Sequence, residues 1–421
     1  MELLKDLEYR GLINQVTDLE GLTKKLEEGP ITLYCGFDPT ADSLHIGHLL
    51  TILTLRRFQL AGHKPLPLVG GATGLIGDPS GKKAERTLNE KEIVVQFSDH
   101  IKAQLTRFLD FEGENKAKVV NNYDWIGSLD IISFLRDVGK NFSLNYMLAK
   151  ETVESRIHSG ISFTEFSYMI LQSYDFLKLY EEENCRLQIG GSDQWGNITA
   201  GLELIRKSTD DEGSKAFGFT IPLVTKSDGT KFGKTEGGAI WLDEEKTSPY
   251  ELYQFLINTE DHDVVKFLKY FTFLDHQEID HLALEVKTAP GNRSAQRKLA
   301  EEVTKLVHGE EALKQAIRIS KALFSGELAK LTALEIKQGF KDVPSYQCNE
   351  KEISLVELLV AAQISPSKRQ GREDIKNGAV YVNGQRTTDL EKVISKDERI
   401  EYQFTIIRRG KKKYFLIKYS E

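Results

Sequence analysis

Two histidines three residues apart form the first group of side chains that could do chemistry. His45 and His48 stand at the start of residues 44–60, whose leucine and isoleucine spacing predicts a helix. The start of a helix attracts anions, because its first N–H groups are free and its dipole is positive there. The two imidazoles would add hydrogen-bond donors on one face of such an anion site. Taken alone, the pair is better explained as surface residues or metal ligands.

Two glycine-rich loops hold the other residues of interest. Residues 70–81 form the first loop, where the carboxylate of Asp78 could hold an ammonium group, and three cations follow soon after. This loop lacks the glycine-lysine pattern of a phosphate-binding loop and the GxGxxG pattern of a dinucleotide site. In the second loop, residues 229–238, Lys231 and Lys234 could follow the charge of a polyphosphate during a reaction. Each loop alone fits a simpler interpretation, a turn with solvated charges or an exposed hairpin tip.

The elements that must position these residues are predicted as alternating strands and helices. Apolar, β-prone runs predict strands, and longer runs with helical spacing predict helices. Strand, loop, helix and strand in this order indicate a βαβ unit in a mainly parallel sheet. The predicted strands are 31–35, 65–69, 118–120, 186–189 and 217–225, and the predicted helices are 44–60, 130–136, 163–180 and 197–207.

The second half of the chain has a different pattern. Residues 249–324 are almost entirely helical in their spacing, and Pro344 with its polar neighbours predicts a linker around 339–351. Short helices and strands are predicted beyond it. The helices are 355–361 and 368–377, and the strands are 379–382, 401–407 and 413–419.

The composition is that of a globular chain. Its 421 residues, 40% hydrophobic and 28% charged, suggest about two to four domains. No run of about 18 apolar residues predicts a membrane helix, and the first residues lack a signal-peptide pattern. Three distant cysteines without a CxxC pair favour a reducing cytoplasm and argue against a structural zinc site. The whole chain carries −7, but residues 351–421 hold 15 Lys and Arg against 10 Asp and Glu, so this end could be a nucleic-acid module.

Three segments that occur in this order decide between these interpretations. They are YCGFDPTADSLHIGH at 34–48, QIGGSDQWGN at 188–197 and KFGKT at 231–235. HIGH and a KxxKT loop are the signatures of class I aminoacyl-tRNA synthetases, and the chain closely resembles the bacterial tyrosyl-tRNA synthetases over essentially its whole length. The resemblance implies the α/β fold class. Its expected parts are a Rossmann-like catalytic domain at 1–246, a helical anticodon-binding domain at 247–326, a linker at 327–351 and a small α+β RNA-binding domain at 352–421.

The resemblance implies a reaction in two steps. The carboxylate of L-tyrosine attacks the α-phosphorus of ATP, giving tyrosyl-adenylate and pyrophosphate, and the tyrosyl group then moves to the 3′-terminal adenosine of tRNA(Tyr). Since the first nucleophile is already a carboxylate, the protein must position it and stabilise charge on the pyrophosphate. ATP would be a substrate with Mg²⁺ carried on it, and no protein metal site or tightly bound cofactor is expected.

By the same resemblance, three sets of residues would form the active site. Those expected to stabilise or follow the phosphates are Thr40, His45, His48, Lys82, Arg86, Lys231, Lys234 and Thr235. Those expected to hold ATP and the adenylate are Cys35, Gly36, Asp38, Gly47, His48, Thr51, Gly191, Asp193 and Lys234. Those expected to hold tyrosine are Tyr34, Asp78, Tyr168, Gln172, Asp175, Gln188 and Gln194. Tyr34 and Asp175 would bond the phenol hydroxyl and so select against phenylalanine, which leaves both unpaired.

Residues 352–421 resemble the RNA-binding domain of small ribosomal-subunit protein four. Its lysines and arginines would contact tRNA phosphates, so binding should weaken with added salt. The residues expected to contact tRNA are Lys368, Arg369, Arg372, Arg408, Arg409, Lys411, Lys412 and Lys413. The resemblance further implies a cytoplasmic homodimer with L-tyrosine, ATP and tRNA(Tyr) as partners and no contact with a membrane.

Three alternatives stay open at this point. A tryptophanyl-tRNA synthetase would share the fold, although the segments around Tyr34 and Asp175 and the C-terminal module argue against it. A nucleotidyltransferase of the HIGH fold needs no tRNA-binding tail, and an RNA-binding or splicing protein on a synthetase scaffold would not need the phosphate-handling residues. Tyrosine-dependent ATP–pyrophosphate exchange would separate all of these.

Overall fold

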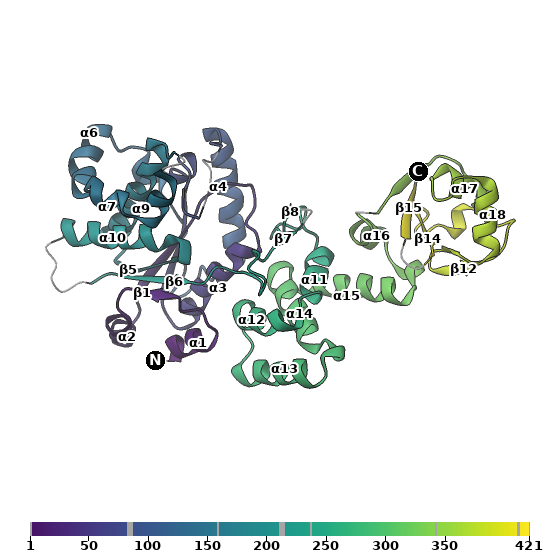
Figure 1. Cartoon of the computed structure of the whole chain (residues 1–421), viewed down its shortest axis with the longest axis horizontal. Coiled ribbons are helices and arrows are strands. Elements are labelled where there is room, and N and C mark those ends of the chain that lie inside the picture. Colours follow the sequence, from purple (N-terminus) through teal and green to yellow (C-terminus); the bar gives the residue numbers. More distant parts are fainter. Residues whose placement is uncertain are drawn as a thin grey trace. The chain divides into compact units, whose positions relative to one another are not determined.

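Two compact units make up the chain (Figure 1). The computed structural model describes residues 2–81, 87–157, 160–209, 215–235, 238–341, 343–410 and 413–420. The first unit contains residues 1–246 and 260–295, and the second contains residues 247–259 and 296–421. The helical domain expected at residues 247–326 is therefore divided between the two units, because α12 (Asp261–Phe271) and α13 (His276–Thr288) belong to the first unit.

A six-stranded sheet forms the centre of the first unit. Its strand order is β1-β6-β5-β2-β3-β4, and each neighbouring pair is parallel except β1 with β6. β2 pairs with β3 residue by residue, from Thr32 opposite Lys64 to Phe37 opposite Val69. The strands are β1 (Gln15–Val16), β2 (Thr32–Phe37), β3 (Lys64–Val69), β4 (Val120–Asn121), β5 (Cys185–Gly191) and β6 (Phe217–Ile221). The mainly parallel sheet predicted from the sequence is confirmed.

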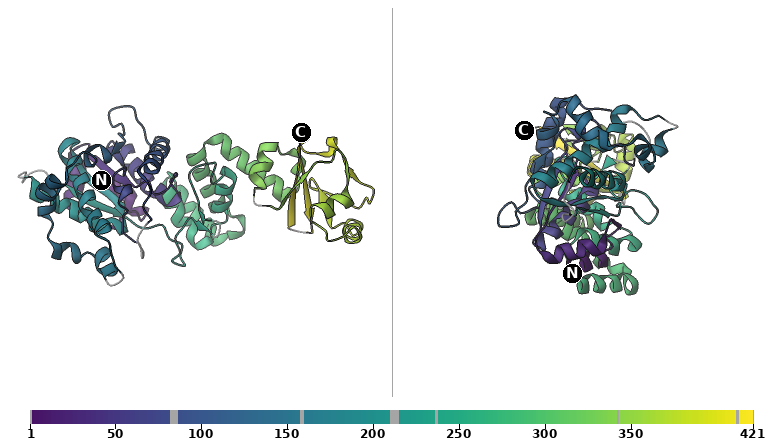
Figure 2. Two further views of the ribbon diagram at one scale, coloured as in Figure 1. Left: turned by 90° about the horizontal axis from the view of Figure 1, so that it is seen from above. Right: turned by 90° about the vertical axis from the view of Figure 1, so that its left-hand side faces the viewer.

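Helices cover both faces of this sheet (Figures 1 and 2). On one face the ring of Tyr34 meets Phe176, with ring centroids 5.2 Å apart. Side chains alternate along a strand, so the register places Phe219 on the opposite face, where it meets Phe58 at 6.1 Å. The helices that carry these contacts or flank them are α3 (Ile46–Leu60), α9 (Phe163–Glu182) and α10 (Trp195–Ser208). The central strands are buried on both sides, as is usual for parallel sheets.

The remaining helices of the first unit surround this core. α12 packs against α3. A π-helix at Phe134–Val138 occupies part of the segment where an ordinary helix was predicted. The others are α1 (Glu2–Tyr9), α2 (Leu19–Glu28), α4 (Lys91–Leu105), α5 (Tyr123–Ile126), α6 (Ile131–Ser133), α7 (Leu144–Leu148) and α8 (Glu151–Ile157). Among the helices that the structure describes, none is long and apolar enough to cross a membrane.

The second unit joins helices to a five-stranded sheet. The sheet has the order β12-β11-β14-β15-β9, in which β9 runs parallel to β15 and the other pairs are antiparallel. Its strands are β9 (Ser345–Cys348), β11 (Val380–Val382), β12 (Gln385–Thr387), β14 (Phe404–Arg409) and β15 (Lys413–Tyr419). The helices are α11 (Pro249–Ile257), most of α14 (Ser294–His308), α15 (Glu310–Ser325), α16 (Ala333–Gly339), α17 (Leu355–Ala361) and α18 (Lys368–Lys376).

Residues 327–351, which we expected as a linker, belong to the folded part of this unit. They contain α16 and β9, and β9 extends the sheet beside β15. Ile336 and Phe340 are buried in one core with Leu416 of β15. Pro344 had suggested a linker, but it lies directly before β9, a position at which a strand tolerates the missing N–H group.

Candidate active site

One cavity opens where the parallel strands β2 and β5 end. Its volume is about 380 Å³, a size typical of small-molecule sites. Ligands of open α/β sheets bind at this carboxyl edge of the strands. Every residue predicted to hold tyrosine or ATP lines the cavity, and so do Thr40, His45 and Lys231. The fold thus gathers side chains from widely separated segments, whose individual roles stay predictions.

Asp175 is a buried carboxyl group in the wall of this cavity, with 2% of its surface exposed. Nδ2 of Asn122 donates to one carboxyl oxygen at 3.0 Å, and Nε1 of Trp125 donates to the other at 2.8 Å. Burial raises the pKa of the Asp175 carboxyl to about 8, although these two donors pull the pKa down. With one N–H on each oxygen, the group can accept a further bond from a ligand hydroxyl.

Tyr34 lies near Asp175 in the same wall. Its side chain is buried, and its hydroxyl has no hydrogen-bond partner among the described residues. Burial, reinforced by the nearby charge of Asp175, raises the pKa of this hydroxyl well above its ordinary value. A buried hydroxyl without a partner costs free energy, which a ligand bonded to it would recover. Tyr34 and Asp175 together offer a donor and an acceptor to a phenol hydroxyl.

A chain of hydrogen bonds runs from Asp175 to Tyr168. Nδ2 of Asn122 donates to Oγ1 of Thr73 at 2.9 Å as well as to Asp175. The hydroxyl of Thr73 donates to Oδ1 of Asp38 at 2.7 Å, and the hydroxyl of Tyr168 donates to Oδ2 at 2.7 Å. Asp38, which we expected beside ATP, therefore also fixes Tyr168 and links it to the Asp175 end of the cavity.

A second network surrounds the carboxylate of Asp78. Nε2 of Gln194 donates to Oδ2 of Asp78 at 2.7 Å, and the N–H of Ser80 donates to Oδ1 at 2.8 Å. Nε2 of Gln172 donates to Oε1 of Gln194 at 3.2 Å. Nδ2 of Asn197 lies 3.1–3.2 Å from oxygens of Ser80, Gln172 and Gln194. These amides hold Asp78 where its carboxylate can accept bonds from an ammonium group.

The two histidines cap the start of α3. Nδ1 of His45 accepts the N–H of Gly47 at 3.1 Å, and Nδ1 of His48 accepts the N–H of His45 at 3.1 Å. The rings stack with centroids 3.8 Å apart. Gly47 makes this possible, because a Cβ there would lie 2.8 Å from the His45 ring. With both Nδ1 atoms accepting, Nε2 carries the proton of each neutral ring and is the nitrogen that would donate to an anion.

The KFGKT loop packs beside these histidines. Gly233 has φ of +85°, and a Cβ there would collide with Cγ2 of Ile46. The N–H of Ile240 donates to the carbonyl of Gly233 at 2.9 Å, and the carbonyl of Ile240 accepts the N–H of Ile46 at 2.9 Å. Lys231 and Lys234 are exposed and line the cavity on this side. The fold thus brings the two signature segments to one cavity.

Several predicted side chains lie outside the described residues. Lys82 and Arg86 belong to the undescribed residues 82–86, and the side chain of Thr235 is not described. Within the described parts of the chain, no group of His, Cys, Asp and Glu could hold a metal ion. The roles of Lys82, Arg86 and Thr235 stay predictions from the resemblance.

Comparison with known proteins covers nearly the whole chain. Residues 25–325 match the family described as tRNA synthetases class I (W and Y), and residues 335–417 match the tyrosine--tRNA ligase SYY-like C-terminal domain. The tyrosine--tRNA ligase of Bacillus velezensis is 71% identical over 419 residues, 99% of both chains. That of Geobacillus stearothermophilus is 70% identical over 421 residues, 100% of both chains. The chain belongs to the tyrosine--tRNA ligases, a family of class I tRNA synthetases.

Solved structures of this family share the fold. A C-terminally truncated mitochondrial tyrosyl-tRNA synthetase from Aspergillus nidulans aligns with a TM-score of 0.69 at 32% identity, over 76% of this chain and 94% of that chain. A tryptophanyl-tRNA synthetase from Encephalitozoon cuniculi aligns with a TM-score of 0.54 at 14% identity, over 74% and 87%, which shows a common fold alone. Because the relatives at 70–71% sequence identity are tyrosine--tRNA ligases, the tryptophanyl alternative is set aside.

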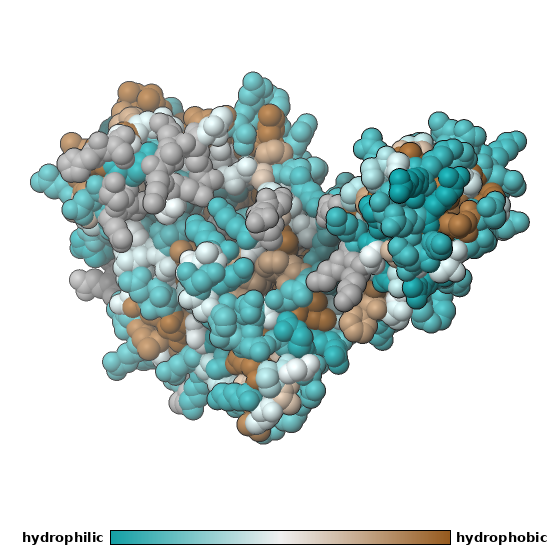
Figure 3. Space-filling model, turned by 45° about the vertical axis from the view of Figure 1, so that its right-hand side comes forward, coloured by the Kyte–Doolittle hydropathy of each residue, from teal (hydrophilic) through white to brown (hydrophobic). Residues whose placement is uncertain are grey.

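One group of the predicted tRNA contacts lies on α18. Lys368, Arg369 and Arg372 are exposed on this helix, together with Lys376. Nζ of Lys368 pairs with the exposed Glu357 at 2.8 Å, and such surface pairs are weak. Hydrophilic side chains cover most of the visible face of the C-terminal module in Figure 3. The α18 cations are therefore accessible to a phosphate backbone.

The other predicted tRNA contacts lie at the β14–β15 hairpin. Arg409 pairs with Asp374 at 2.9 Å and donates to the carbonyl of Ile364 at 2.7 Å, so it ties β14 to the helices. The guanidinium of Arg408 lies 3.7 Å from the ring centre of Tyr381. Lys413 is exposed. Lys411 and Lys412 fall outside the described residues.

Sequence reasoning missed the residues that hold the site from behind. Asn122 and Trp125 orient Asp175, Thr73 belongs to the chain from Asp175 to Tyr168, and Asn197 belongs to the network around Asp78. A signal for Asn122 existed, since it lies two residues after the predicted strand at 118–120, and the carboxyl edge of a parallel sheet is where ligands bind. Trp125 gave no such signal, because its partner Asp175 is 50 residues away in sequence.

Proposed function

We propose that the chain activates L-tyrosine with ATP to form tyrosyl-adenylate and then transfers the tyrosyl group to the 3′-terminal adenosine of tRNA(Tyr). The buried pair of Tyr34 and Asp175 carries this proposal, because it offers a donor and an acceptor to a phenol hydroxyl. Phenylalanine would leave the buried Tyr34 hydroxyl without a partner and would not use the remaining acceptor position of Asp175, which disfavours it strongly.

The rest of the cavity supports the activation step. The ammonium group of tyrosine would lie at Asp78 and Gln172, with its carboxylate directed toward the start of α3. This carboxylate needs no protein base to attack ATP. Nε2–H of the two histidines and the lysines of the KFGKT loop would stabilise charge on the departing pyrophosphate. ATP brings its Mg²⁺ with it, and the chain contributes position and charge.

Tyrosine-dependent ATP–pyrophosphate exchange with the purified full chain tests the first step. We expect exchange with L-tyrosine and a kcat/KM at least about 10³-fold lower with L-phenylalanine. Exchange with tryptophan in place of tyrosine would overturn the assignment. Charging of a tRNA(Tyr) transcript tests the second step, and adenylate formation without charging would overturn the transfer.

We also propose that the chain is a cytoplasmic homodimer. Exposed apolar side chains on α6, α7, the adjoining π-helix and the start of α9 support a self-association surface, since a patch of this kind usually marks an interface. These side chains are Ile131, Ile132, Leu135, Leu144, Leu148 and Phe163. Free, buried Cys35, Cys185 and Cys348 are compatible with a reducing cytoplasm.

Sedimentation of two matched variants tests the dimer. Phe163 is 77% exposed within this patch, and Phe324 is 97% exposed on α15 of the second unit. We expect Phe163→Glu to weaken the dimer and Phe324→Glu to leave it unchanged. A wild-type chain that sediments as a monomer at micromolar concentration would contradict the proposal.

A further inference from the structure

Asp263, near the start of α12, holds the backbone that leads into the KFGKT loop. Its side chain is 3% exposed, and Oδ1 accepts the N–H of Ser227 at 3.0 Å. Nζ of Lys266, one turn further along α12, donates to the carbonyl of Thr225 at 2.5 Å and lies 3.5 Å from Asp263. Two side chains of one helix therefore fix the chain shortly before the two lysines of the loop.

The centre of the loop is attached to the same helix. The ring of Phe232 packs on Phe267 and Phe271 of α12, with centroids 4.0 and 5.7 Å apart. Phe232 is 6% exposed, whereas Lys231 and Lys234 on either side of it are exposed. The loop is thus anchored to α12 by its aromatic residue and presents its cations to the cavity.

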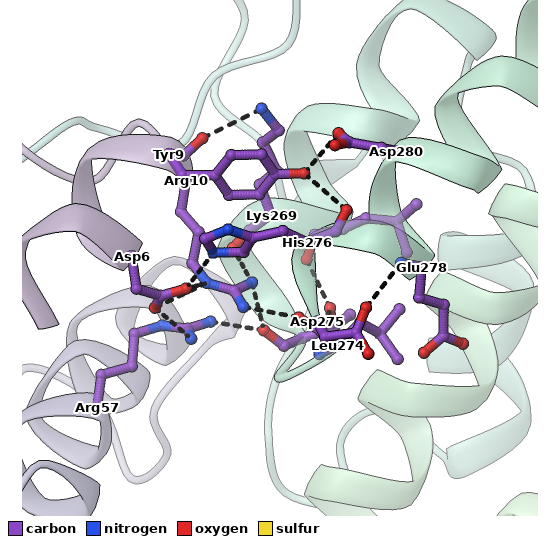
Figure 4. A network of polar contacts seen from close by, with 12 residues as sticks. Asp6, Tyr9, Arg10, Arg57, Lys269, Leu274, Asp275, His276, Glu278 and Asp280 are labelled. Carbon is purple, nitrogen blue, oxygen red and sulfur yellow. Dashed lines mark hydrogen bonds and ion pairs between the residues drawn. The ribbon is translucent and has the colours of Figure 1, made fainter. Parts of the chain in front are cut away.

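The other end of α12 is tied to α3, the helix that begins with the two histidines. Arg57, in the last turn of α3, donates to the carbonyl of Thr272 at 2.5 Å. Arg10 donates to the carbonyls of Thr272 and Leu274 at 3.2 and 2.7 Å. Asp6 lies beside both guanidinium groups, and Figure 4 shows this cluster between α1 and the α12–α13 corner. The histidine segment therefore begins α3, the KFGKT loop packs on α12, and these two helices are joined.

We propose that α12 sets the position of the lysine loop beside the two histidines, and that Asp263 is the positioning residue at the end of α12 nearest the loop. This inference rests on the proposed function. Asp263 does not line the cavity. It acts through Ser227, by limiting the loop to conformations in which Lys231 and Lys234 reach the phosphates. Its loss would then slow the ATP step and leave tyrosine binding intact.

Asp263→Asn tests this role, because the amide weakens the bond to Ser227 with little change in volume. We expect kcat/KM for ATP in pyrophosphate exchange to fall about tenfold, as for the loss of one charge-assisted hydrogen bond, with the Kd for tyrosine within about twofold of wild type. Glu260→Gln is the matched control, since it removes the same charge from an exposed position three residues away. The control should keep wild-type values for both.

Lys266→Met keeps the inference testable if Asp263→Asn folds poorly. Lys266 is part-exposed, so its replacement should preserve the fold while removing the tie to Thr225. We expect the same selective loss in the ATP step. Equal losses in tyrosine affinity and ATP turnover, or no loss in either variant, would overturn the positioning role. A wild-type chain without tyrosine-dependent exchange would instead overturn the proposed function.

Discussion

Burial raises the pKa of the Asp175 carboxyl from an ordinary value near 3.8 to about 8. The folded chain therefore keeps this proton to higher pH than the unfolded chain does. The stability that this bound proton contributes is present at low pH and is lost as the pH rises from about 4 towards 8. Asp175→Asn removes this titration. Without ligand, the melting temperature of the variant should therefore rise relative to that of wild type by several degrees between about pH 5 and about pH 9.

The same substitution should remove tyrosine activation. The amide places an NH₂ group against a donor of Asn122 or Trp125 and has one oxygen fewer to accept a hydrogen bond. We expect kcat/KM for tyrosine in pyrophosphate exchange to fall at least about 100-fold. Glu181→Gln, exposed on the same helix, should change neither property. A melting difference that stays flat with pH would contradict the assignment of the raised pKa.

His45 has one role in the structure and a second role that we propose, and one pair of variants can separate them. Its Nδ1 caps α3, and its Nε2 would donate to a phosphate. Asn is a good N-cap without the reach of an imidazole, whereas Ala loses the cap at a cost of about 1 kcal/mol. We expect His45→Asn to retain the wild-type melting temperature and His45→Ala to lower it. Both should slow adenylate formation at least about tenfold in single-turnover measurements, and a wild-type rate in His45→Asn would leave the cap as the only role.

The sequence predicted the residues that point into the cavity better than those behind it. Tyr168, Gln172 and Asp175 fall at i, i+4 and i+7, which predicts one helix face, and all three line the cavity. The donors to Asp175 come from Asn122 and Trp125, about 50 residues away, and only the packing of the folded chain brings them together. Periodicity describes one element at a time, so it cannot identify such partners.

At the scale of elements, Asp6 joins α1 to α3 and α13. It accepts from Arg10 at 2.8 Å and from Arg57 at 3.4 Å, two arginines whose side chains are 4% exposed, and it lies 2.8 Å from Nε2 of His276 (Figure 4). Burial raises the pKa of Asp6. The hydrogen bond to His276 and the charge and hydrogen bond of Arg10 together lower it by more, so the pKa of Asp6 is below the ordinary value. The stability from Asp6 is therefore present above the ordinary Asp pKa and is lost as the pH falls through the lowered value.

Asp6→Asn should leave two buried arginines without their counter-charge. We expect the free energy of unfolding at neutral pH to fall by about 2–4 kcal/mol, measured by denaturant titration. The difference from wild type should shrink below about pH 4, where the wild-type carboxylate itself becomes protonated. Glu8→Gln, exposed on the same helix, is the control and should be neutral. An equal loss at all pH values would mean that the charge of Asp6 is not what stabilises this corner.

The elements themselves were predicted well where one segment determines them. β2, β3, α3 and α9 lie within two residues of the predicted ranges, because each is a long apolar or periodic run. The assignment of α12 to the first unit and of β9 to the C-terminal sheet could not be predicted in this way. Both depend on contacts with segments far along the chain, such as Phe232 for α12 and β15 for β9.

At the scale of the whole molecule, the sequence indicates where charge gathers but not which charges are available. The basic balance of residues 351–421 pointed to an RNA-binding module. In the folded module, Arg386, Arg399 and Arg409 donate to backbone carbonyls of neighbouring elements. The cations of α18 have no comparable backbone attachment in the described contacts. The exposed face of α18 is therefore the better candidate for tRNA contact. The count of charges alone could not distinguish it from the arginines that bond to the backbone.

Replacing Lys368, Arg369 and Arg372 together by Gln tests this face. We expect KM for tRNA(Tyr) to rise about tenfold or more, and the dependence of log KM on log salt to become shallower by up to about one unit per lost contact. ATP–pyrophosphate exchange should be unchanged, since α18 belongs to the second unit and the cavity to the first. Arg409→Gln is the informative control: it leaves the largely buried Asp374 without its cationic partner, so it should lower the melting temperature more than it changes the salt dependence. If the triple variant charges tRNA(Tyr) with wild-type KM and salt dependence, the RNA-binding face lies elsewhere on the chain.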